Sequence, residues 1–366
     1  MKACLEPAHD PSPTSLPAVK VISVLLLILS GGLVWAGCLG TTQTEALKIG
    51  LVAPFEGARR QLGYDVLAAV RIAVREQNEA GGVQGRPILI VALNDEDHAE
   101  QARWQAQKMA LDPAVMGVLG HWSRETTEAA LSIYQEAGLP LVIPTAGDDE
   151  LGGACAVHIA PMYEELSHVM LDTLAQRARG ARVALFVQPA HWQAALAESL
   201  QAAGLEILLP TGDGKAVQAD LALVSLDYES TARTLEEIQS PAVFLLNDLY
   251  WPIIQRLGQS STSSLWVWTL ESSDENTLTR FRETYRHDTG HEPSLQAQLA
   301  YDGARLLLHA ANAAGTREDR LSRQAICRSL RVDMENGITG PLTFDAAGRR
   351  IGLQVRFRPL AELLSE

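Results

Sequence analysis

The feature that most constrains the fold of this 366-residue chain is a regular alternation of apolar strands with amphipathic helices. An apolar run at residues 47–54 is followed by a helical pattern at residues 64–79, and the strand PILIVALND comes next. The Gly81-Gly82 pair favours the end of that helix, because glycine tolerates the left-handed cap conformation. Such alternation predicts right-handed βαβ units, and therefore a parallel sheet with helices on both faces.

The same alternation starts again near residue 156 and runs to the strand LWVWTL. A strand at residues 156–161, a helix at 163–179 and the clearly buried strand RVALFVQ open this second series. From residue 276 onward helices dominate, and such a run fits a chain that returns to cover the first lobe better than a separate domain. The pattern therefore predicts an α/β fold with two similar doubly wound lobes.

Two neighbouring strands of the first series end in polar loops. The run MGVLG is followed by HWSR at residues 121–124, and the run LPLVIP by TAGD at residues 145–148. In parallel α/β sheets, ligands bind beyond the carboxyl ends of the strands. We therefore expect these two loops to bind a small molecule, with the rest of the chain as their scaffold.

Charge and motif content exclude several classes of function. The formal net charge of −14 argues against non-specific binding to nucleic acid. The chain has no glycine-rich phosphate loop and no G-x-S-x-G or H-E-x-x-H motif, so we predict neither an enzyme nor a bound cofactor. The acidic cluster at residues 95–98 is compatible with a metal site, but a solvated loop between strand and helix is the favoured interpretation.

A secretory signal precedes the first predicted strand. Lys20 stands before the apolar run VISVLLLILSGGLVWAG, which ends just before Cys38. A basic residue, an apolar stretch and small residues before a cleavage site form such a signal, and the Ala-Gly-Cys ending resembles that of a bacterial lipoprotein, in which Cys38 is lipidated. Trp35 stands where that signal usually has leucine, so an uncleaved N-terminal membrane anchor is the alternative. Both interpretations place the bulk of the chain outside the cytoplasm, next to a membrane.

Cysteine is sparse, with four in the whole chain. If Cys4 is removed with the signal and Cys38 carries lipid, only Cys155 and Cys327 remain. Their separation shows no metal-binding spacing. A disulfide between them is an open alternative outside the cell, but we favour two separate buried thiols.

Several motifs, in order, resemble one known family. They are LKIGLVAPFEGARRQLGYDVLAAVRIAVREQNEAGGVQGRPILIV, IYQEAGLPLVIPTA, AYDGARLLLHAANAAG and GITGPLTFDAAGRR. Together they resemble type I periplasmic binding proteins of the branched-chain amino-acid class, the substrate-binding components of ABC importers. The resemblance covers residues 47–358, and it is specific because separate motifs occur in the right order.

The resemblance implies two lobes joined by three crossover strands, with the ligand in the cleft between them. We place the crossovers near residues 158–162, 268–272 and 342–349. The expected segments are a lipoprotein signal at 1–38, a tether at 39–46, lobe 1 at 47–160 and 272–342, and lobe 2 at 161–271 and 343–366.

The resemblance also implies where an amino acid is held. In this family the ligand carboxylate lies against the turn after the third strand and the loop after the fourth, which map onto Ser123-Arg124 and Thr145-Ala146-Gly147. The family usually has serine at Arg124 and threonine at Gly147. Arg124 either replaces the lost hydroxyl with a bidentate pair to an anionic group or points outward from the helix start. The hydroxyls of Ser123 and Thr145 either bind the ligand or make ordinary capping hydrogen bonds.

Acidic and aromatic residues complete the predicted site. Asp248 follows the strand AVFLLN and matches the family position whose carboxylate holds the ligand ammonium, with helix capping as its alternative role. Tyr228 and Trp192 match aromatic wall positions, and Trp122 adjoins the first turn. Each aromatic residue alone is more often part of a core, but three at strand-to-helix turns indicate a lined cleft.

These observations predict an extracytoplasmic solute-binding lipoprotein. It captures an amino acid or a related small polar molecule by hinge closure and delivers it to an ABC permease in the membrane. We expect no catalytic residues and no metal, and the resemblance implies a monomer. Two alternatives stay open: a sensor that signals to a partner receptor or kinase, and an extracytoplasmic enzyme on the same scaffold, for which we find no acid–base pair.

Overall fold

The computed structural model of this chain describes residues 45–175, 180–209, 218–246, 263–317 and 321–363. The predicted signal segment, with Cys38, lies outside these residues. Residues from Ala46 onward belong to one unit, which begins at the end of the predicted tether. Among the helices that are described, none is both long and apolar enough to span a bilayer.

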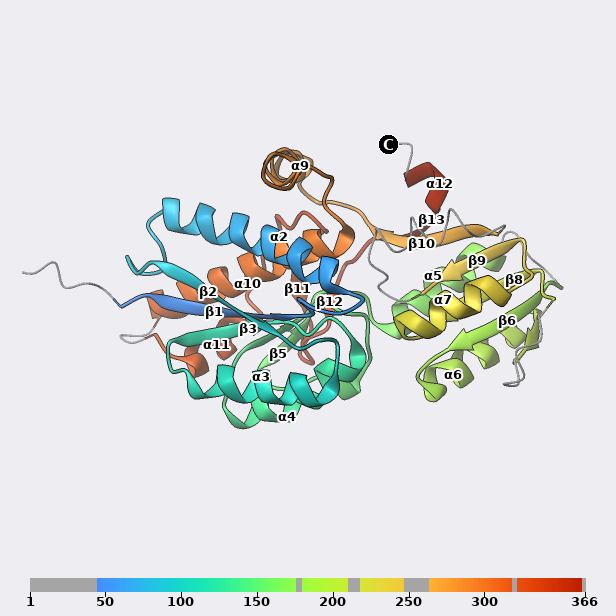
Figure 1. Cartoon of the computed structure of the whole chain (residues 1–366), viewed down its shortest axis with the longest axis horizontal. Helices are drawn as coiled ribbons and strands as arrows, with labels where there is room; N and C mark the ends of the chain where they lie inside the picture. Colours follow the sequence, from blue (N-terminus) through green and yellow to red (C-terminus); the bar gives the residue numbers. More distant parts are fainter. Residues whose placement is uncertain (1–44, 176–179, 210–217, 247–262, 318–320, 364–366) are drawn as a thin grey trace, which may run out of the picture. The chain divides into compact units, whose positions relative to one another are not determined.

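Five parallel strands form the first sheet, in the order β2-β1-β3-β4-β5 (Figure 1). Their bounds are β1 Leu47–Ala53, β2 Ile88–Asn94, β3 Val115–Leu119, β4 Leu141–Ile143 and β5 Ala156–His158. The strands are rich in Val, Leu and Ile, as expected when helices cover both faces. The strand order reverses between β1 and β3, and ligands bind in the crevice at such a switch point.

Helices cover both faces of this sheet. Their bounds are α2 Arg60–Glu79, α3 Ala99–Leu111, α4 Arg124–Glu136, α9 Glu275–Thr289, α10 Leu295–Arg317 and α11 Arg323–Ser329. Helices α2 and α10 pack together over one face, where Leu306 shares a core with Leu51. Helices α3 and α4 pack together over the other face, with Met109 and Tyr134 in a second core. The late helical segment therefore returns to cover the first sheet, which confirms that prediction.

The second sheet has six strands in the order β13-β10-β9-β8-β6-β7. Its strands are β6 Arg182–Val187, β7 Glu206–Leu208, β8 Leu221–Ser225, β9 Ala242–Leu245, β10 Ser264–Leu270 and β13 Val355–Pro359. Only β13 runs antiparallel to its neighbour, so the described part of this sheet is otherwise parallel. The helices along these strands are α5 Tyr163–Ala175, α6 Ala190–Ala202, α7 Tyr228–Glu237 and α12 Leu360–Leu363. The α/β fold with two doubly wound sheets is confirmed.

A buried arginine ties together segments that follow the first sheet. Arg350 opens the short strand β12 (Arg350–Ile351), which pairs with β11 (Thr343–Phe344). Its guanidinium donates to the carbonyl oxygens of Ile159, Thr339, Gly340 and Pro341 at 2.7–2.9 Å. The backbone N–H of His158 also donates to the carbonyl oxygen of Gly348, at 2.9 Å. Two predicted crossover segments therefore lie side by side here, while the exact lobe bounds remain a prediction.

The structure corrects our interpretation of the cysteines. Cys155 and Cys327 form a disulfide, with their Cα atoms 4.9 Å apart. Both residues are half-buried, so neither is the isolated buried thiol that we favoured. The bond joins the residue before β5 to α11, and a Cα separation of this size is normal for a disulfide.

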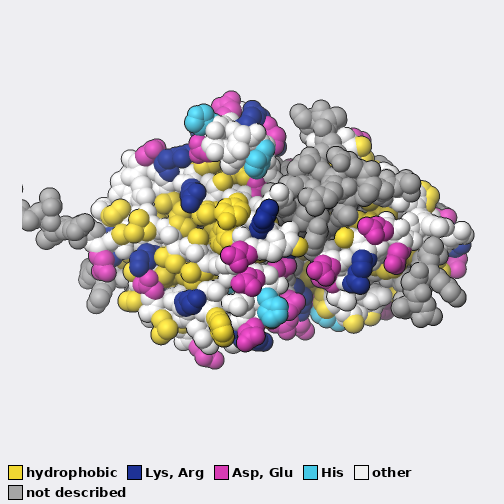
Figure 2. Space-filling view, viewed as in Figure 1, with side chains coloured by type: hydrophobic (Ala, Val, Ile, Leu, Met, Phe, Trp, Pro, Cys, Tyr) yellow, Lys and Arg dark blue, Asp and Glu magenta, His cyan; other side chains and the backbone are white. Residues whose placement is uncertain are grey.

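Strand β2 forms one edge of the first sheet. Hydrophobic side chains gather over β2 and α2 on the face shown in Figure 2. Leu89 of β2 is 52% exposed. A shallow groove beside Leu89 is lined by Arg71, Val74 and Asn78 of α2. This groove lies along the side of β2 and not beyond the carboxyl ends of the strands, so it is separate from the predicted site.

Candidate ligand-binding site

The loops after β1, β3 and β4 come together at the carboxyl edge of the first sheet. Arg59, in the loop after β1, donates from Nη2 to the carbonyl oxygen of Trp122 in the loop after β3, at 2.9 Å. Arg124, which follows the same loop, donates from Nη1 to Oδ2 of Asp148 after β4, also at 2.9 Å. The two loops singled out in the sequence are therefore neighbours in space.

Ser123 caps helix α4. Its Oγ accepts a hydrogen bond from the backbone N–H of Thr126, and its carbonyl oxygen accepts from the hydroxyl of Thr127 at 2.7 Å. A serine at the N-cap satisfies one of the four unpaired N–H groups that open a helix. The structure thus shows the capping alternative for Ser123, while a ligand contact remains a prediction.

Arg124 points toward two acidic side chains. Its Nη1 pairs with Asp148, and its Nη2 lies 2.7 Å from Oε2 of Glu150 in the short 3-10 helix Asp149–Leu151. The Arg124 and Asp148 side chains are 19% and 20% exposed, so this pair is partly shielded from water. Burial opposes ionisation of both groups, but the hydrogen bond and charges between them prevail. The pKa of Asp148 is therefore lowered, and the pKa of Arg124 is raised.

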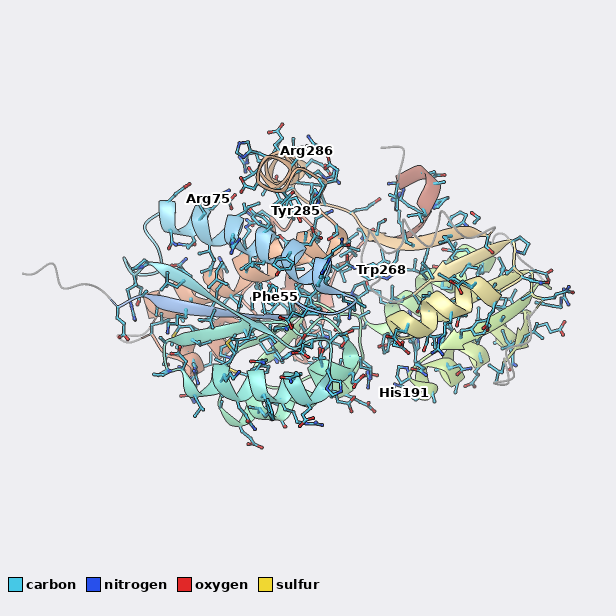
Figure 3. All side chains as sticks on the ribbon, viewed as in Figure 1. Phe55, Arg75, His191, Trp268, Tyr285 and Arg286 are labelled. Atoms are coloured by element: carbon cyan, nitrogen blue, oxygen red, sulfur yellow. A yellow bond between two sulfur atoms is a disulfide. The ribbon has the colours of Figure 1, made fainter. Side chains whose placement is uncertain are left out.

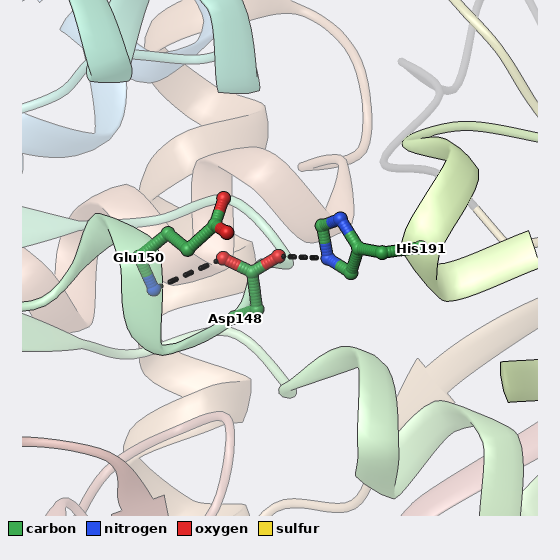
Figure 4. Close-up of side chains that lie close together, drawn as sticks. All are labelled: Asp148, Glu150 and His191. Carbon is green, nitrogen blue, oxygen red and sulfur yellow. Dashed lines mark hydrogen bonds and ion pairs between the residues drawn. The ribbon is translucent and has the colours of Figure 1, made fainter.

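His191 connects this cluster to the second sheet. Its Nε2 lies 2.8 Å from Oδ2 of Asp148, the oxygen that also accepts from Arg124 (Figure 4). His191 stands at the start of α6, just after the loop that follows β6 (Figure 3). The carboxyl ends of β4 and β6 therefore meet at one carboxylate, although the two strands belong to different sheets.

The same cluster has the composition of a metal site. Ligand atoms of Asp148, Glu150 and His191 all lie within 4.8 Å of one another. Arg124, however, donates to both carboxylates and already supplies their positive charge. A metal ion would have to displace that guanidinium, so the arrangement fits an ion-pair network.

Two buried polar atoms flank the site. The indole Nε1 of Trp122 and the hydroxyl Oγ1 of Thr145 have no hydrogen-bond partner among the described residues. Both side chains are buried, with 2% and 3% exposed. Most buried polar groups are hydrogen-bonded, so these two groups are exceptions among the described residues.

Ala146, Gly147 and Trp192 lie in a packed junction. The carbonyl oxygen of Gly147 accepts from the backbone N–H of Tyr163 at 2.7 Å, and Ala146 shares a core with Tyr163 and Trp192. The Trp192 and Tyr163 rings stack with their centroids 3.9 Å apart, and Nε1 of Trp192 donates to Oγ of Ser167 at 2.9 Å. The packing explains why Trp192 is buried, and its role in lining a cleft remains a prediction.

Two predicted site residues remain, Tyr228 and Asp248. Tyr228 is the first residue of α7, because Asp227 caps the helix; the sequence pattern predicts this helix at residues 231–239, three residues later. The side chain of Tyr228 and the whole of Asp248 lie outside the described residues.

Sequence reasoning missed a buried polar network behind the first loop. Nδ1 of His121 lies 2.7 Å from Oδ2 of Asp95, and its Nε2 lies 3.1 Å from the hydroxyl of Tyr134. All three side chains are buried. The interpretation of residues 95–98 as a solvated loop is therefore wrong for Asp95, which is fully buried. In the same loop, Oδ1 of Asp97 lies 2.9 Å from Nη1 of Arg59. The signal in the sequence was a histidine directly after an apolar strand.

Comparisons with known proteins find similar sequences over most of this chain. Residues 46–360 match the family model described as periplasmic binding protein. The chain is 28% identical to the Leu/Ile/Val-binding protein of Escherichia coli over 128 residues, which covers 34% of this chain and about a third (35%) of that protein. It is 25% identical to Leu/Ile/Val-binding protein homolog 7 of Brucella melitensis over 334 residues, covering 80% of this chain and 82% of the relative.

A solved structure shows the same fold. It is the branched-chain amino acid transporter substrate binding protein of Streptococcus pneumoniae in complex with isoleucine. The TM-score is 0.69 at 20% identity, and the match covers 86% of this chain and 100% of that chain. The shared fold thus extends over most of the chain.

Proposed function

The chain belongs to the periplasmic binding protein family, and on this premise we propose that it is an extracytoplasmic solute-binding protein for an amino acid or a related small polar molecule. The observation that carries the proposal is the meeting of the loops after β3, β4 and β6 at Asp148, within the matched region. The names of its relatives support the amino-acid class.

The chemistry of the loops suits the acceptor oxygens of such a ligand. The buried donors of Trp122 and Thr145 lack partners among the described residues, and a ligand carboxylate or carbonyl oxygen would supply an acceptor to both. The loop that holds Trp122 leads into the N-terminus of α4, where the helix dipole favours a negative group. The ammonium group of the ligand is assigned to Asp248, by resemblance to the family.

Ligand capture then follows by hinge closure. The site draws on loops from both sheets, and a ligand that contacts both stabilises the form in which they are closest. In that proposal the segments tied by Arg350 stay fixed while the loops around Asp148 close and open. An ABC permease in the membrane receives the ligand from the closed form, and a lipid on Cys38 keeps the protein near the permease.

A binding screen tests the ligand class. The purified protein is melted with each of the twenty amino acids, small amides, polyamines, dicarboxylates and sugars, and hits are titrated by calorimetry. A ligand at a hundred times its dissociation constant stabilises the fold by about 2.7 kcal/mol, which gives a clear shift in Tm. Asp248→Ala is expected to abolish the shift, whereas shifts caused only by compounds without an amino group would contradict the ammonium role of Asp248.

Separate experiments test the anchor and the transport role. Labelling cells with an alkyne fatty acid is expected to tag the wild-type protein and not Cys38→Ala. Deleting the gene is expected to reduce uptake of the identified ligand severalfold, and uptake is restored by the wild-type gene. Unchanged uptake would contradict delivery to an importer and favour the sensor alternative.

A further inference from the structure

Three hydrophobic side chains are exposed near the edge strand of the first sheet. Leu89 of β2 is about half exposed, and Trp104 and Leu111 of α3 are 53% and 82% exposed. We call these three residues the edge cluster. Single exposed hydrophobic residues are common on protein surfaces and need no explanation, so the argument depends on whether the three lie together.

The contacts of β1 bring Leu89 and Leu111 close to each other. Lys48 of β1 is the register partner of Leu89 in β2. The Nζ atom of Lys48 also lies 2.7 Å from Oδ2 of Asp112, the residue directly after Leu111. Leu89 and Leu111 therefore lie near the same residue, at the amino end of the sheet.

Trp104 and Leu111 share one side of α3. They are seven residues apart, and seven residues make almost two turns of a helix. Lys108 lies on the same side, is exposed, and donates from Nζ to Oε1 of the neutral Gln105 at 3.1 Å. Tryptophan and leucine with a lysine between them are typical of a helix face in a membrane interface, where the lysine reaches the headgroups.

The edge cluster is close to the point where the chain enters the first sheet. Leu47, the first residue of β1, pairs with Ile88, next to Leu89. Cys38 stands nine residues before Leu47 in the sequence, and nine extended residues span at most about 30 Å. Both interpretations of the N-terminus attach the chain to a membrane at or before Cys38. Each of them therefore keeps Leu47 within that distance of the bilayer surface.

We propose that the edge cluster is a membrane contact, through which the tethered protein lies on the lipid headgroups with the amino end of its first sheet. Three side chains bind a bilayer weakly on their own, but a short tether raises their effective concentration to about the millimolar range. This inference rests on the predicted membrane attachment and goes beyond ligand binding.

The proposed contact is compatible with ligand capture. The strands of the first sheet are parallel, and the candidate ligand-binding loops follow the carboxyl ends of β1, β3 and β4. The edge cluster lies toward the other end of these strands. Contact with the membrane therefore leaves the candidate loops open to solvent.

Quenching by a spin-labelled lipid tests the contact. The full-length protein is reconstituted through its own N-terminal segment into vesicles of phosphatidylethanolamine and phosphatidylglycerol that also contain a lipid with a nitroxide on its headgroup. An environment-sensitive fluorophore is attached to Leu111→Cys or, as the control, to Leu209→Cys, whose native side chain is 57% exposed after β7 of the second sheet. The wild type, treated in the same way, gives the background from native cysteines. We expect at least about threefold more quenching at position 111 than at position 209, because side chains in the interface lie among the headgroups.

A negative charge in the edge cluster is expected to abolish the contact. Trp104→Glu, combined with Leu111→Cys, should lower the quenching at position 111 to the level at position 209, because a carboxylate is poorly accommodated where an apolar side chain is buried. Leu209→Glu, combined with Leu111→Cys, is the matched control. It adds the same charge at a similarly exposed hydrophobic position and should leave the quenching unchanged. Circular dichroism checks that each variant is folded.

The outcomes separate this inference from the proposed function. Equal quenching at positions 111 and 209, or unchanged quenching in Trp104→Glu, overturns the inference. Shielding of the fluorophore at position 111 that grows with protein density in vesicles without nitroxide also overturns it, and indicates that a second copy of the chain covers the edge cluster. Loss of the protein from the vesicles contradicts the predicted attachment, and the inference fails with it. Ligand affinity in Trp104→Glu is expected to equal that of the wild type, so a failure of the solute-binding proposal is detected separately.

Discussion

Nδ1 of His121 lies 2.7 Å from Oδ2 of Asp95, and both side chains are buried. Asp95 follows β2, whereas His121 belongs to the loop after β3, so the contact links the ends of two strands that flank β1. Tyr134 extends the link to α4. The network therefore holds the turn from which Trp122 and Ser123 project.

Removal of the Asp95 carboxylate is expected to destabilise the protein. In Asp95→Ala, Nδ1 of His121 stays buried without its partner, and an unsatisfied buried polar group costs about 1–3 kcal/mol. Urea denaturation measures the free energy of unfolding. Glu292→Ala is the control, because its ion pair with Arg286 is exposed and such a change costs less than about 0.5 kcal/mol. Equal effects of the two substitutions would contradict a structural role for the buried contact.

Reduction of the Cys155–Cys327 disulfide is expected to lower stability. The bond closes a loop between residues 172 positions apart, and its removal typically costs about 2–5 kcal/mol. Melting curves with and without dithiothreitol measure the effect, and the Cys155→Ala/Cys327→Ala variant is the control because the reductant should not change its Tm. If the wild type melts at the same temperature in both conditions, the bond is absent or contributes nothing.

The guanidinium of Arg350 cannot be replaced by an ammonium group. Burial lowers the pKa of Arg350 to about 10, although the negative charges of Asp302 and Glu165 raise it. The N–H groups of its guanidinium donate to four carbonyl oxygens. Lysine has no fork of donors to match them. Arg350→Lys is therefore expected to cost about 3 kcal/mol of unfolding free energy. Arg356→Lys, at an exposed position, should change it by less than about 0.5 kcal/mol, and a similar loss in both variants would refute the argument.

Asp148 and Asp302 are expected to affect the pH dependence of stability in opposite directions. Despite its burial, the pKa of Asp148 lies below the ordinary value of 3.8, chiefly through Arg124. The contribution of Asp148 to the free energy of unfolding is therefore present above pH 3.8, and it is lost as the pH falls through the lower pKa of the folded state. Burial raises the pKa of Asp302, so its contribution is present below pH 3.8 and lost as the pH rises through the folded pKa.

Melting temperatures between pH 7 and pH 3 test both signs. The advantage of the wild type over Asp148→Asn should shrink toward acid pH, and its advantage over Asp302→Asn should grow. A parallel trend for the two variants would show that one of the assigned directions is wrong.

The sequence predicted the elements that rest on local pattern. Apolar runs such as MGVLG became buried parallel strands, because strands covered on both faces leave no polar positions. The proximity of the two loops after β3 and β4 was also predicted, since the carboxyl ends of neighbouring parallel strands lie at one edge of a sheet, while ligand binding there stays a prediction. Helix starts were less accurate: α7 begins at Tyr228 because the preceding Asp227 caps it, a signal that hydrophobic periodicity does not contain.

Contacts between distant residues could not be predicted in this way. Asp95 and His121 look like solvent-facing loop residues until the sheet order places their strands on either side of β1. The pairing of Cys155 with Cys327 likewise depends on where α11 packs. Arg124 had two interpretations from the sequence, and its actual partners, Asp148 and Glu150, follow it by more than twenty residues.

The first sheet also has a consequence for synthesis of the chain. Its strands are complete at His158, but α10, which covers one face of the sheet, begins only at Leu295. Until the ribosome has added that helix, α2 alone covers this face of the sheet, and apolar surface that stays exposed is prone to aggregate. A product truncated before Leu295 would therefore expose the part of its first core that α10 covers, so the first lobe is among the last parts to finish folding.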